Sequence, residues 1–202
     1  MRGVGAGRHL IAFVKAPRLG TVKTRLAADL GALAALRFYR ATSARLLRRL
    51  GRDPRWTLWL AVTPDRLAHA ARLWPVGARV LSQGGGDLGA RMARALRRVP
   101  PGPAIVIGSD VPEITPPLIA RGFAALGRND AVFGPALDGG YWLVGLSARA
   151  RGLDPFAGVR WSSPHALADT LANFAPSRRV ALIDALDDID TIADYDRWRG
   201  RS

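Results

Sequence analysis

Two lysines and a few aspartates are the residues whose types and positions suggest chemistry in this chain. Of 30 basic residues only Lys15 and Lys23 are lysines, and both lie in the short segment 15–25. A lysine ammonium is a compact point charge that suits a phosphate, and arginine does not replace it freely. The segment joins an apolar run to a helical pattern, where backbone N–H groups also bind anions. We predict a phosphate site here that includes Gly20 and Arg25.

A second candidate loop, Gln83-Gly-Gly-Gly-Asp87, lies directly before a helical pattern over residues 88–98. Glycines allow the backbone to approach a flat or phosphorylated ligand closely, and the helix N-terminus adds N–H groups. The residues predicted to bind such a ligand from this loop are Gln83, Gly85, Asp87 and Arg91. A glycine turn followed by an aspartate cap explains the same pattern equally well.

Aspartates at the ends of two other segments suggest a metal site. Asp110 follows the apolar run 103–109, and Asp190 lies in the acidic stretch 186–191. Hard divalent cations such as Mg²⁺ or Mn²⁺ prefer carboxylate oxygens and often bridge substrate phosphates. The chain has no cysteine and a single glutamate, so aspartates must do any carboxylate chemistry. The structural alternatives are a turn role for Asp110 and a helix-capping role for Asp190.

Asp138 lies in a glycine turn between two apolar runs, 130–134 and 141–147. A carboxylate at this position is a candidate general base, although Asp-Gly is also a common hairpin signal. The two interpretations are equally supported by the local sequence. The later segment Trp161-Ser-Ser-Pro-His165 is typical of a serine N-cap with a proline near the start of a helix.

Apolar strand-like runs and helical patterns alternate along the whole chain, which is typical of an α/β fold. The helical segment 24–50 is predicted to break at Gly31, and Asp87 is the expected N-cap of the helix over 88–98. The strands are predicted at residues 9–14, 56–62, 78–82, 103–109, 130–134, 141–147 and 178–183. In open α/β sheets ligands bind beyond the carboxyl ends of the strands, so the loops after 14, 82 and 109 should line one crevice.

Length and composition indicate one globular unit. The 202 residues, 49% of them hydrophobic, fit a single domain over residues 9–202, preceded by a flexible tip over residues 1–8. The apolar run after the tip is too short for a signal peptide or a membrane span, so we predict a cytoplasmic protein. The net charge of +14 suggests nucleic-acid binding, but the arginines are scattered along helical segments without a long basic run. Solvated arginine-rich faces are the favoured explanation, with no nucleic-acid or membrane partner.

Several motifs occur in an order that resembles a family of small bacterial glycosyltransferases of the GT-A type, which includes the arsenosugar-biosynthesis glycosyltransferases. The resemblance spans residues 9–197. The motifs that carry it are Lys15-Ala-Pro with Gly20-Thr-Val-Lys-Thr-Arg-Leu26, Gln83-Gly-Gly-Gly-Asp-Leu-Gly-Ala-Arg-Met92, Ile107-Gly-Ser-Asp-Val-Pro112, Gly134-Pro-Ala-Leu-Asp-Gly-Gly-Tyr-Trp-Leu-Val-Gly145, Trp161-Ser-Ser-Pro164 and Asp188-Ile-Asp-Thr191.

The resemblance implies a single Rossmann-like GT-A domain with a mostly parallel central sheet and helices on both faces. It implies a nucleotide-sugar donor, a small-molecule acceptor and a bound Mg²⁺ or Mn²⁺. In this chain it assigns Lys15, Lys23 and Arg25 to the donor phosphates and Asp110 to the metal. It places Asp138 on the acceptor side.

A related group, the molybdenum-cofactor and phospholactate guanylyltransferases, keeps an alternative open. The pairs Asp110 with Pro112 and Asp190 with Thr191 resemble the pattern of those enzymes, and the Asp-x-Asp pair of many GT-A transferases is absent after the strand at 103–109. This alternative is nucleotidyl transfer, in which a nucleoside triphosphate reacts with a phosphorylated acceptor and pyrophosphate leaves.

Overall fold

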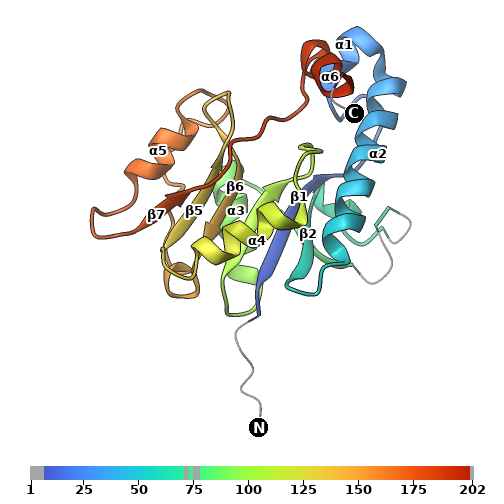
Figure 1. Ribbon diagram of the computed structural model, residues 1–202. Coiled ribbons are helices and arrows are strands. Elements are labelled where there is room, and N and C mark those ends of the chain that lie inside the picture. Colours follow the sequence, from blue (N-terminus) through green and yellow to red (C-terminus); the bar gives the residue numbers. More distant parts are fainter. Residues whose placement is uncertain (1–6, 71–72, 75–77, 201–202) are drawn as a thin grey trace.

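The computed structural model describes residues 7–70, 73–74 and 78–200, so most of the tip predicted over residues 1–8 lies outside the described residues. Within the described part, seven strands form one sheet in the order β3-β2-β1-β4-β6-β5-β7 (Figure 1). The strands are β1 (His9–Lys15), β2 (Thr57–Thr63), β3 (Arg79–Ser82), β4 (Ala104–Gly108), β5 (Ala131–Pro135), β6 (Tyr141–Leu146) and β7 (Val180–Leu182).

The sheet is parallel except for β6, which runs antiparallel to both of its neighbours, β4 and β5. Strands β1 and β4 are almost continuous apolar runs with buried residues on both faces. That pattern is expected of central parallel strands covered by helices on each side. The mostly parallel sheet predicted from the sequence is confirmed.

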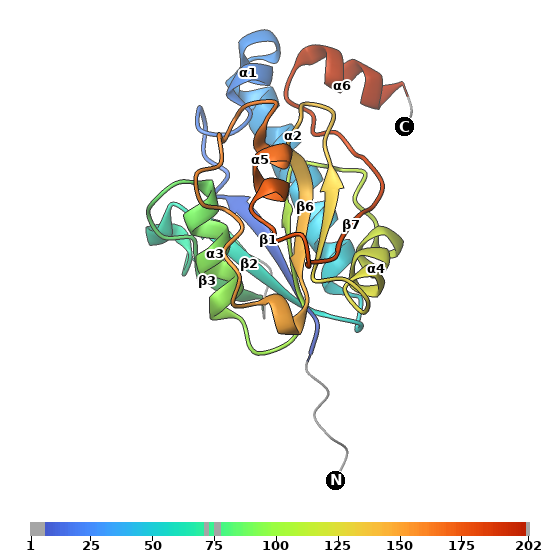
Figure 2. The same cartoon turned by 90° about the vertical axis from the view of Figure 1, so that its left-hand side faces the viewer.

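Helices cover both faces of the sheet (Figures 1 and 2). Helices α2 and α4 pack on one face, helices α3 and α5 lie on the other, and α1 and α6 lie together beyond the carboxyl edge. The helices are α1 (Thr24–Leu30), α2 (Ala32–Gly51), α3 (Leu88–Arg98), α4 (Pro116–Ala125), α5 (Ala166–Ala172) and α6 (Ile192–Arg199), with short 3-10 turns at Asp65–Leu67 and Ala148–Ala150. Among the described residues no helix combines the length and apolar character that a membrane crossing requires.

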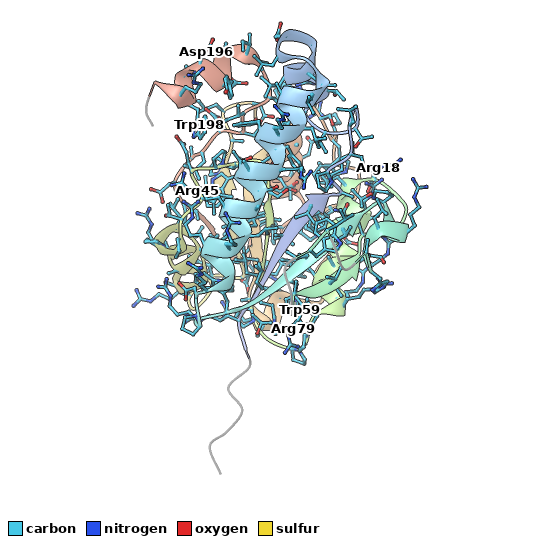
Figure 3. All side chains as sticks on the ribbon, turned by 90° about the vertical axis from the view of Figure 1, so that its right-hand side faces the viewer. Arg18, Arg45, Trp59, Arg79, Asp196 and Trp198 are labelled. Atoms are coloured by element: carbon cyan, nitrogen blue, oxygen red, sulfur yellow. The ribbon has the colours of Figure 1, made fainter. Side chains whose placement is uncertain are left out.

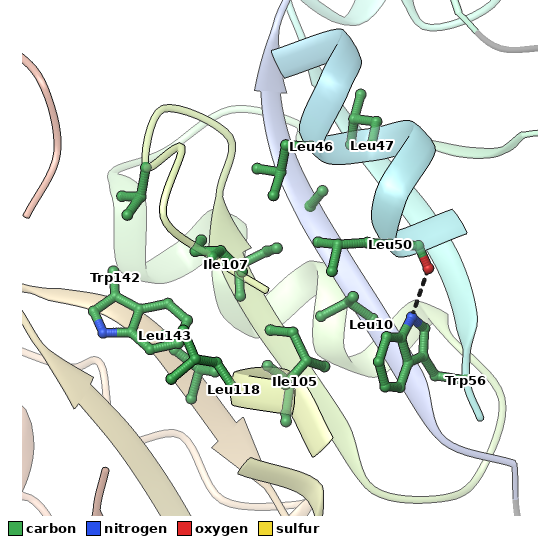
Figure 4. Close-up of a cluster of buried hydrophobic side chains, with 14 of the residues drawn as sticks. Leu10, Leu46, Leu47, Leu50, Trp56, Ile105, Ile107, Leu118, Trp142 and Leu143 are labelled. Atoms are coloured by element: carbon green, nitrogen blue, oxygen red, sulfur yellow. Dashed lines mark hydrogen bonds between the residues drawn. The ribbon is translucent and has the colours of Figure 1, made fainter. Parts of the chain in front are cut away.

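The larger core cluster holds α2 and α4 against the sheet and so fixes the carboxyl edge where the candidate residues lie. Leu46 and Leu50 of α2 are fully buried with Leu10 of β1 and Ile105 of β4 (Figure 4). The Nε1 of buried Trp56 donates to the Leu50 carbonyl at 3.0 Å, which anchors the end of α2. Truncating one of these leucines to alanine costs about 2–5 kcal/mol in comparable cores.

Most helix boundaries follow the sequence signals. Gly31, with φ 82°, separates α1 from α2, and the Asp87 side chain accepts the Ala90 N–H at 2.8 Å as the cap of α3. The predicted serine cap after Trp161 is wrong. Helix α5 begins only at Ala166 with His165 at its N-cap, because Ser163 closes a local turn by accepting the His165 N–H at 3.3 Å.

The arginines are spread over different elements (Figure 3). Arg18 lies in the loop after β1, Arg45 on α2 and Arg79 on β3, and all three are exposed. The Arg79 guanidinium lies 5.3 Å from the centre of the Trp59 ring, where it makes a cation–π contact. The positive charge is therefore distributed across the surface and does not follow one helix.

Candidate functional site

Lys23 lies at the centre of a group of carboxylates at the carboxyl edge of the sheet. Its Nζ is 2.7 Å from Asp190 Oδ1 and 3.2 Å from Asp110 Oδ2, and its side chain is only 4% exposed. Lys23 caps α1 in a left-handed backbone conformation, φ 47°, which is uncommon for a residue with a side chain. Burial disfavours the ammonium, but the charges of Asp110 and Asp190 outweigh that cost and raise the pKa of Lys23 above its ordinary value.

Three aspartates form the acidic cluster: Asp110, Asp188 and Asp190. One carboxylate oxygen from each lies within 4.8 Å of the others. Burial first, and then the charge of Asp190, raise the pKa of Asp188 to about 6. The cluster already holds one cation, the Lys23 ammonium, and its oxygen donors are those that Mg²⁺ and Mn²⁺ prefer. The residues present therefore fit a divalent cation.

Local structure explains how each acid reaches the cluster. Gly108 ends β4, and a β-carbon there would lie 2.8 Å from Asp110 Oδ1, so glycine leaves room for the Asp110 carboxylate. Thr191 and Asp194 form a capping box at the start of α6. Because Thr191 caps that helix, the side chain of Asp190 is available for the cluster.

Tyr39 fixes the end of β1 beside the acidic cluster. Its hydroxyl lies 2.9 Å from the Lys15 carbonyl oxygen, to which it donates, 3.0 Å from the Lys15 nitrogen and 3.2 Å from Ser109 Oγ. The phenol is buried, which raises its pKa. A neutral hydroxyl from α2 thus joins the ends of β1 and β4, the strands that lead to Lys15 and Asp110.

Two clefts meet at the cluster. The first, of about 520 Å³, contains the loop between β1 and α1, and its charged lining residues are Lys15, Lys23, Arg25, Asp110 and Asp190. The loops after β1, β3 and β4 all line it, as predicted for the carboxyl edge. The second cleft, of about 230 Å³, shares Leu88, Gly108 and Asp110 with the first. Its other acids are Asp138 and Asp188.

The middle of the chain matches a known protein family. Residues 46–163, more than half of the sequence, match the model of the DUF2064 family, described as an uncharacterized protein conserved in bacteria. The chain belongs to this family. No curated protein matches the sequence.

Several solved structures resemble this DUF2064 chain. A proposed nucleotide-diphospho-sugar transferase from Desulfovibrio desulfuricans G20 is 28% identical, with a TM-score of 0.86 over 95% of this chain and 85% of that chain. The manganese complex of Rv0371c from Mycobacterium tuberculosis H37Rv is 18% identical, with a TM-score of 0.55 over 95% and 97% of the two chains. The 4-diphosphocytidyl-2C-methyl-D-erythritol synthase from Anaerococcus prevotii DSM 20548 is 10% identical, with a TM-score of 0.63 over 96% and 98%. The Rossmann-like GT-A fold is confirmed, and so is the resemblance to the nucleotide-sugar transferase and nucleotidyltransferase group.

In the structure, only some of the residues predicted to bind the donor line the first cleft. Lys15, Lys23, Arg25 and Gln83 line it. Buried Gln83 donates its side-chain amide to the Ala61 carbonyl at 2.8 Å, which ties the end of β2 to the cleft floor. The predicted residues outside the cleft lining are Gly20, Gly85, Asp87 and Arg91. A role for these four in donor binding stays a prediction.

Asp188 is the acid that sequence reasoning did not select. Asp187, Asp188 and Asp190 lie within four positions, and no turn or cap signal distinguishes Asp188 from Asp187. In the fold, Asp187 accepts the Leu137 N–H at 3.0 Å, whereas Asp188 lies in the cluster. The alternation of side chains along an extended segment, which sends Asp188 and Asp190 the same way, was the one available signal.

Proposed function

We propose that this DUF2064 protein transfers a glycosyl group from a nucleotide-sugar to a small hydroxyl-bearing acceptor, with a divalent cation at the acidic cluster. The observation that carries the proposal is the position of the acidic cluster between two clefts. The first has basic lining residues, and the second has none among the described residues that line it. The likeness to a proposed nucleotide-diphospho-sugar transferase supports the donor class. A manganese complex among the structural relatives supports the choice of cation.

In this proposal the first cleft holds the donor diphosphate. Lys15 and Arg25 supply positive charge at its lining, and Lys23 approaches the diphosphate from the acidic cluster. Asp110, Asp188 and Asp190 would hold Mg²⁺ or Mn²⁺. When bound, such a cation stabilises the negative charge that develops on the leaving diphosphate.

The second cleft holds the acceptor in the same proposal. The acceptor oxygen attacks the anomeric carbon of the sugar, and the bond from that carbon to the diphosphate oxygen breaks. The electron pair leaves with the nucleoside diphosphate, and Asp138 accepts the proton of the acceptor hydroxyl. Asp138 is exposed on the turn between β5 and β6 and its carboxylate accepts the Gly140 N–H at 2.8 Å, which fixes its orientation.

The first test is a thermal-shift panel of nucleotides and nucleotide-sugars with and without MgCl₂ or MnCl₂. A ligand at 100 times its Kd stabilises the folded state by about 2.7 kcal/mol, roughly 5–10 °C in Tm for a chain of this size. We expect a metal-dependent shift that Asp110→Asn removes. If no nucleotide raises the Tm, the donor site is wrong.

Product analysis then separates the two transfer reactions. Glycosyl transfer releases a nucleoside diphosphate from a nucleotide-sugar, whereas nucleotidyl transfer releases pyrophosphate from a nucleoside triphosphate. Release of pyrophosphate with a phosphorylated acceptor would replace our proposal by the nucleotidyl-transfer alternative. The fold alone does not choose between them, because both reactions occur among proteins that resemble this chain.

A further inference from the structure

The residues that line the second cleft indicate the charge of the acceptor. We infer that it binds an acceptor without a phosphate or carboxylate, a neutral or cationic alcohol that places an apolar ring against an aromatic wall. The inference rests on the proposed function, because it takes this cleft to be the acceptor site. It goes further by choosing the acceptor's chemical class.

The charge of the lining residues is the first argument. The acids in the second cleft are Asp110, Asp138 and Asp188, and none of the described residues that line it is lysine, arginine or histidine. Phosphates in proteins are generally bound by arginine, lysine or helix N-terminal N–H groups. Two helices begin at the described lining, α3 at Leu88 and α5 at Ala166. The Asp87 carboxylate caps α3, where it accepts the Ala90 N–H at 2.8 Å and adds negative charge, and the turn before the seven-residue α5 already uses the His165 N–H. An anionic acceptor would meet three carboxylates and no basic side chain in the described lining of this cleft, because Lys23, whose ammonium pairs with Asp110, lines the first cleft.

A bound divalent cation does not remove this repulsion. Its two charges together with Lys23 balance the three carboxylates of the acidic cluster. Arg25, which also pairs with Asp190 at 3.8 Å, lines the first cleft, so Asp138 remains an additional negative charge in the second. The hydrogen bond that Asp138 accepts comes from a neutral backbone N–H, that of Gly140. Its charge also acts on Asp188, one of the causes that raise the Asp188 pKa. The negative charge of Asp138 therefore acts on groups inside the cleft.

Aromatic side chains form the apolar part of the wall. Tyr141, Trp142 and Trp161 line the cleft together with Leu88. The Tyr141 and Trp161 rings meet edge to face with centroids 6.3 Å apart, and the Trp142 Nε1 donates to the Asp184 carbonyl at 3.0 Å. Fixed aromatic rings bury apolar faces of a ligand at little entropic cost.

The rim of the cleft is preformed and small. The β5–β6 turn packs tightly on the segment before α5: Gly139, with φ 83°, has no room for a β-carbon beside Pro164, and its carbonyl accepts the Leu167 N–H at 3.0 Å. A volume of about 230 Å³ is below the roughly 300–1,000 Å³ of pockets for drug-sized ligands. The cleft is suited to a small ligand that bears an apolar ring and hydroxyl groups.

The test compares a neutral probe with its own phosphate ester. Phenyl β-D-glucopyranoside and its 6-phosphate share the ring and the sugar, so they differ in charge at one position. Saturation-transfer NMR in MgCl₂ measures the Kd of each for the full chain. We expect the neutral glycoside to bind at least tenfold more tightly than the phosphate. Tighter or equal binding of the phosphate, or no binding of the neutral probe, would overturn the inference.

Variants show whether the cleft itself makes this choice. Asp138→Lys should reverse the order of the two probes, and Trp161→Ala should abolish binding of the phenyl glycoside. Leu137→Lys is the matched control, because Leu137 lies on the same turn, is 79% exposed and does not line the cleft. If Leu137→Lys changes the order as much as Asp138→Lys does, general surface charge explains the preference and the inference fails.

A separate measurement distinguishes this inference from the proposed function. The nucleotide-induced Tm shift reports on the first cleft and does not depend on the acceptor probes. A normal nucleotide shift together with a preference for the phosphate ester contradicts the acceptor class and leaves the donor site intact. A preference for the neutral probe without any nucleotide shift contradicts the proposed function and leaves the chemical preference of the second cleft intact.

Discussion

The two clefts share the acidic cluster but differ in almost everything else. The first contains Lys15, Lys23 and Arg25, whereas the second has no basic residue in its described lining and has aromatic walls. The first is the larger, at about 520 Å³ against about 230 Å³. In our proposal, a single group of carboxylates serves a highly charged ligand on one side and an uncharged ligand on the other. The comparison leads us to expect that the charge around the cluster, more than the cluster itself, decides which ligand each cleft binds.

Removal of the carboxylate that both clefts share should have the largest effect. We expect Asp110→Asn to lower turnover at least about 100-fold, since metal charge stabilisation is worth several kcal/mol and about 1.4 kcal/mol corresponds to a factor of ten. Steady-state kinetics and Mn²⁺ calorimetry measure the effect. Asp130→Asn is the control, because Asp130 bonds to Arg149 and the Arg179 backbone and lines neither cleft. Equal turnover in Asp110→Asn and the wild type would remove Asp110 from the reaction.

A change on the acceptor side alone should separate the clefts. Asp138→Asn keeps the turn, because asparagine also accepts the Gly140 N–H and suits an Asn-Gly hairpin. If Asp138 is the general base, kcat falls by about 10²-fold or more while the Kd of the nucleotide stays within twofold. Kinetics with the nucleotide-sugar and calorimetry with the nucleotide measure the two quantities. Wild-type turnover would leave Asp138 with a turn role only.

A change at Lys23 should act on both clefts, because its ammonium pairs with Asp110 and Asp190. We expect Lys23→Arg to retain charge yet lower turnover by about tenfold, because a planar guanidinium does not fit between two carboxylates positioned for an ammonium. Lys23→Ala should lower it further and also lower the Tm of the metal-free protein, since it leaves three carboxylates without their cation. Kinetics and thermal melts measure both. Arg25→Lys changes an exposed side chain and is the comparison variant, in which we expect a smaller loss of turnover.

The smallest effect is expected at a structural acid outside the clefts. Hydrogen bonds from the Arg179 backbone and the Arg149 side chain lower the pKa of Asp130 below its ordinary value. A carboxyl with a lowered folded-state pKa stabilises the protein above its unfolded-state pKa, near 4, and this stability is lost as the pH falls through the folded-state pKa. The Tm of Asp130→Asn should therefore be lower than that of the wild type at pH 7, and the difference should shrink below about pH 4. A constant difference from pH 7 to pH 3 would contradict the role of the charge.

The sequence by itself determined the alternation of strands and helices, the α/β class and the loops at the carboxyl edge. These features depend on local periodicity, glycine turns and caps, which act within a few residues. Asp110 was found for the same reason: it ends a strongly apolar strand, and such positions lie at the rim of an open sheet. Asp190 was selected because it lies in an acidic stretch before a helical pattern and because the pair Asp190-Thr191 resembles the guanylyltransferase pattern.

Only the tertiary structure decided which charges meet. Lys23 is separated by 87 residues from Asp110 and by 167 from Asp190, yet its ammonium contacts both carboxylates. Such pairings depend on the strand order and on the path of the segment after β7, and no local pattern encodes them. The selection of Asp188 over Asp187 and the shared wall between the two clefts have the same origin. Burial and long-range Coulomb interactions, which set the chemistry of these groups, exist only once the chain has folded.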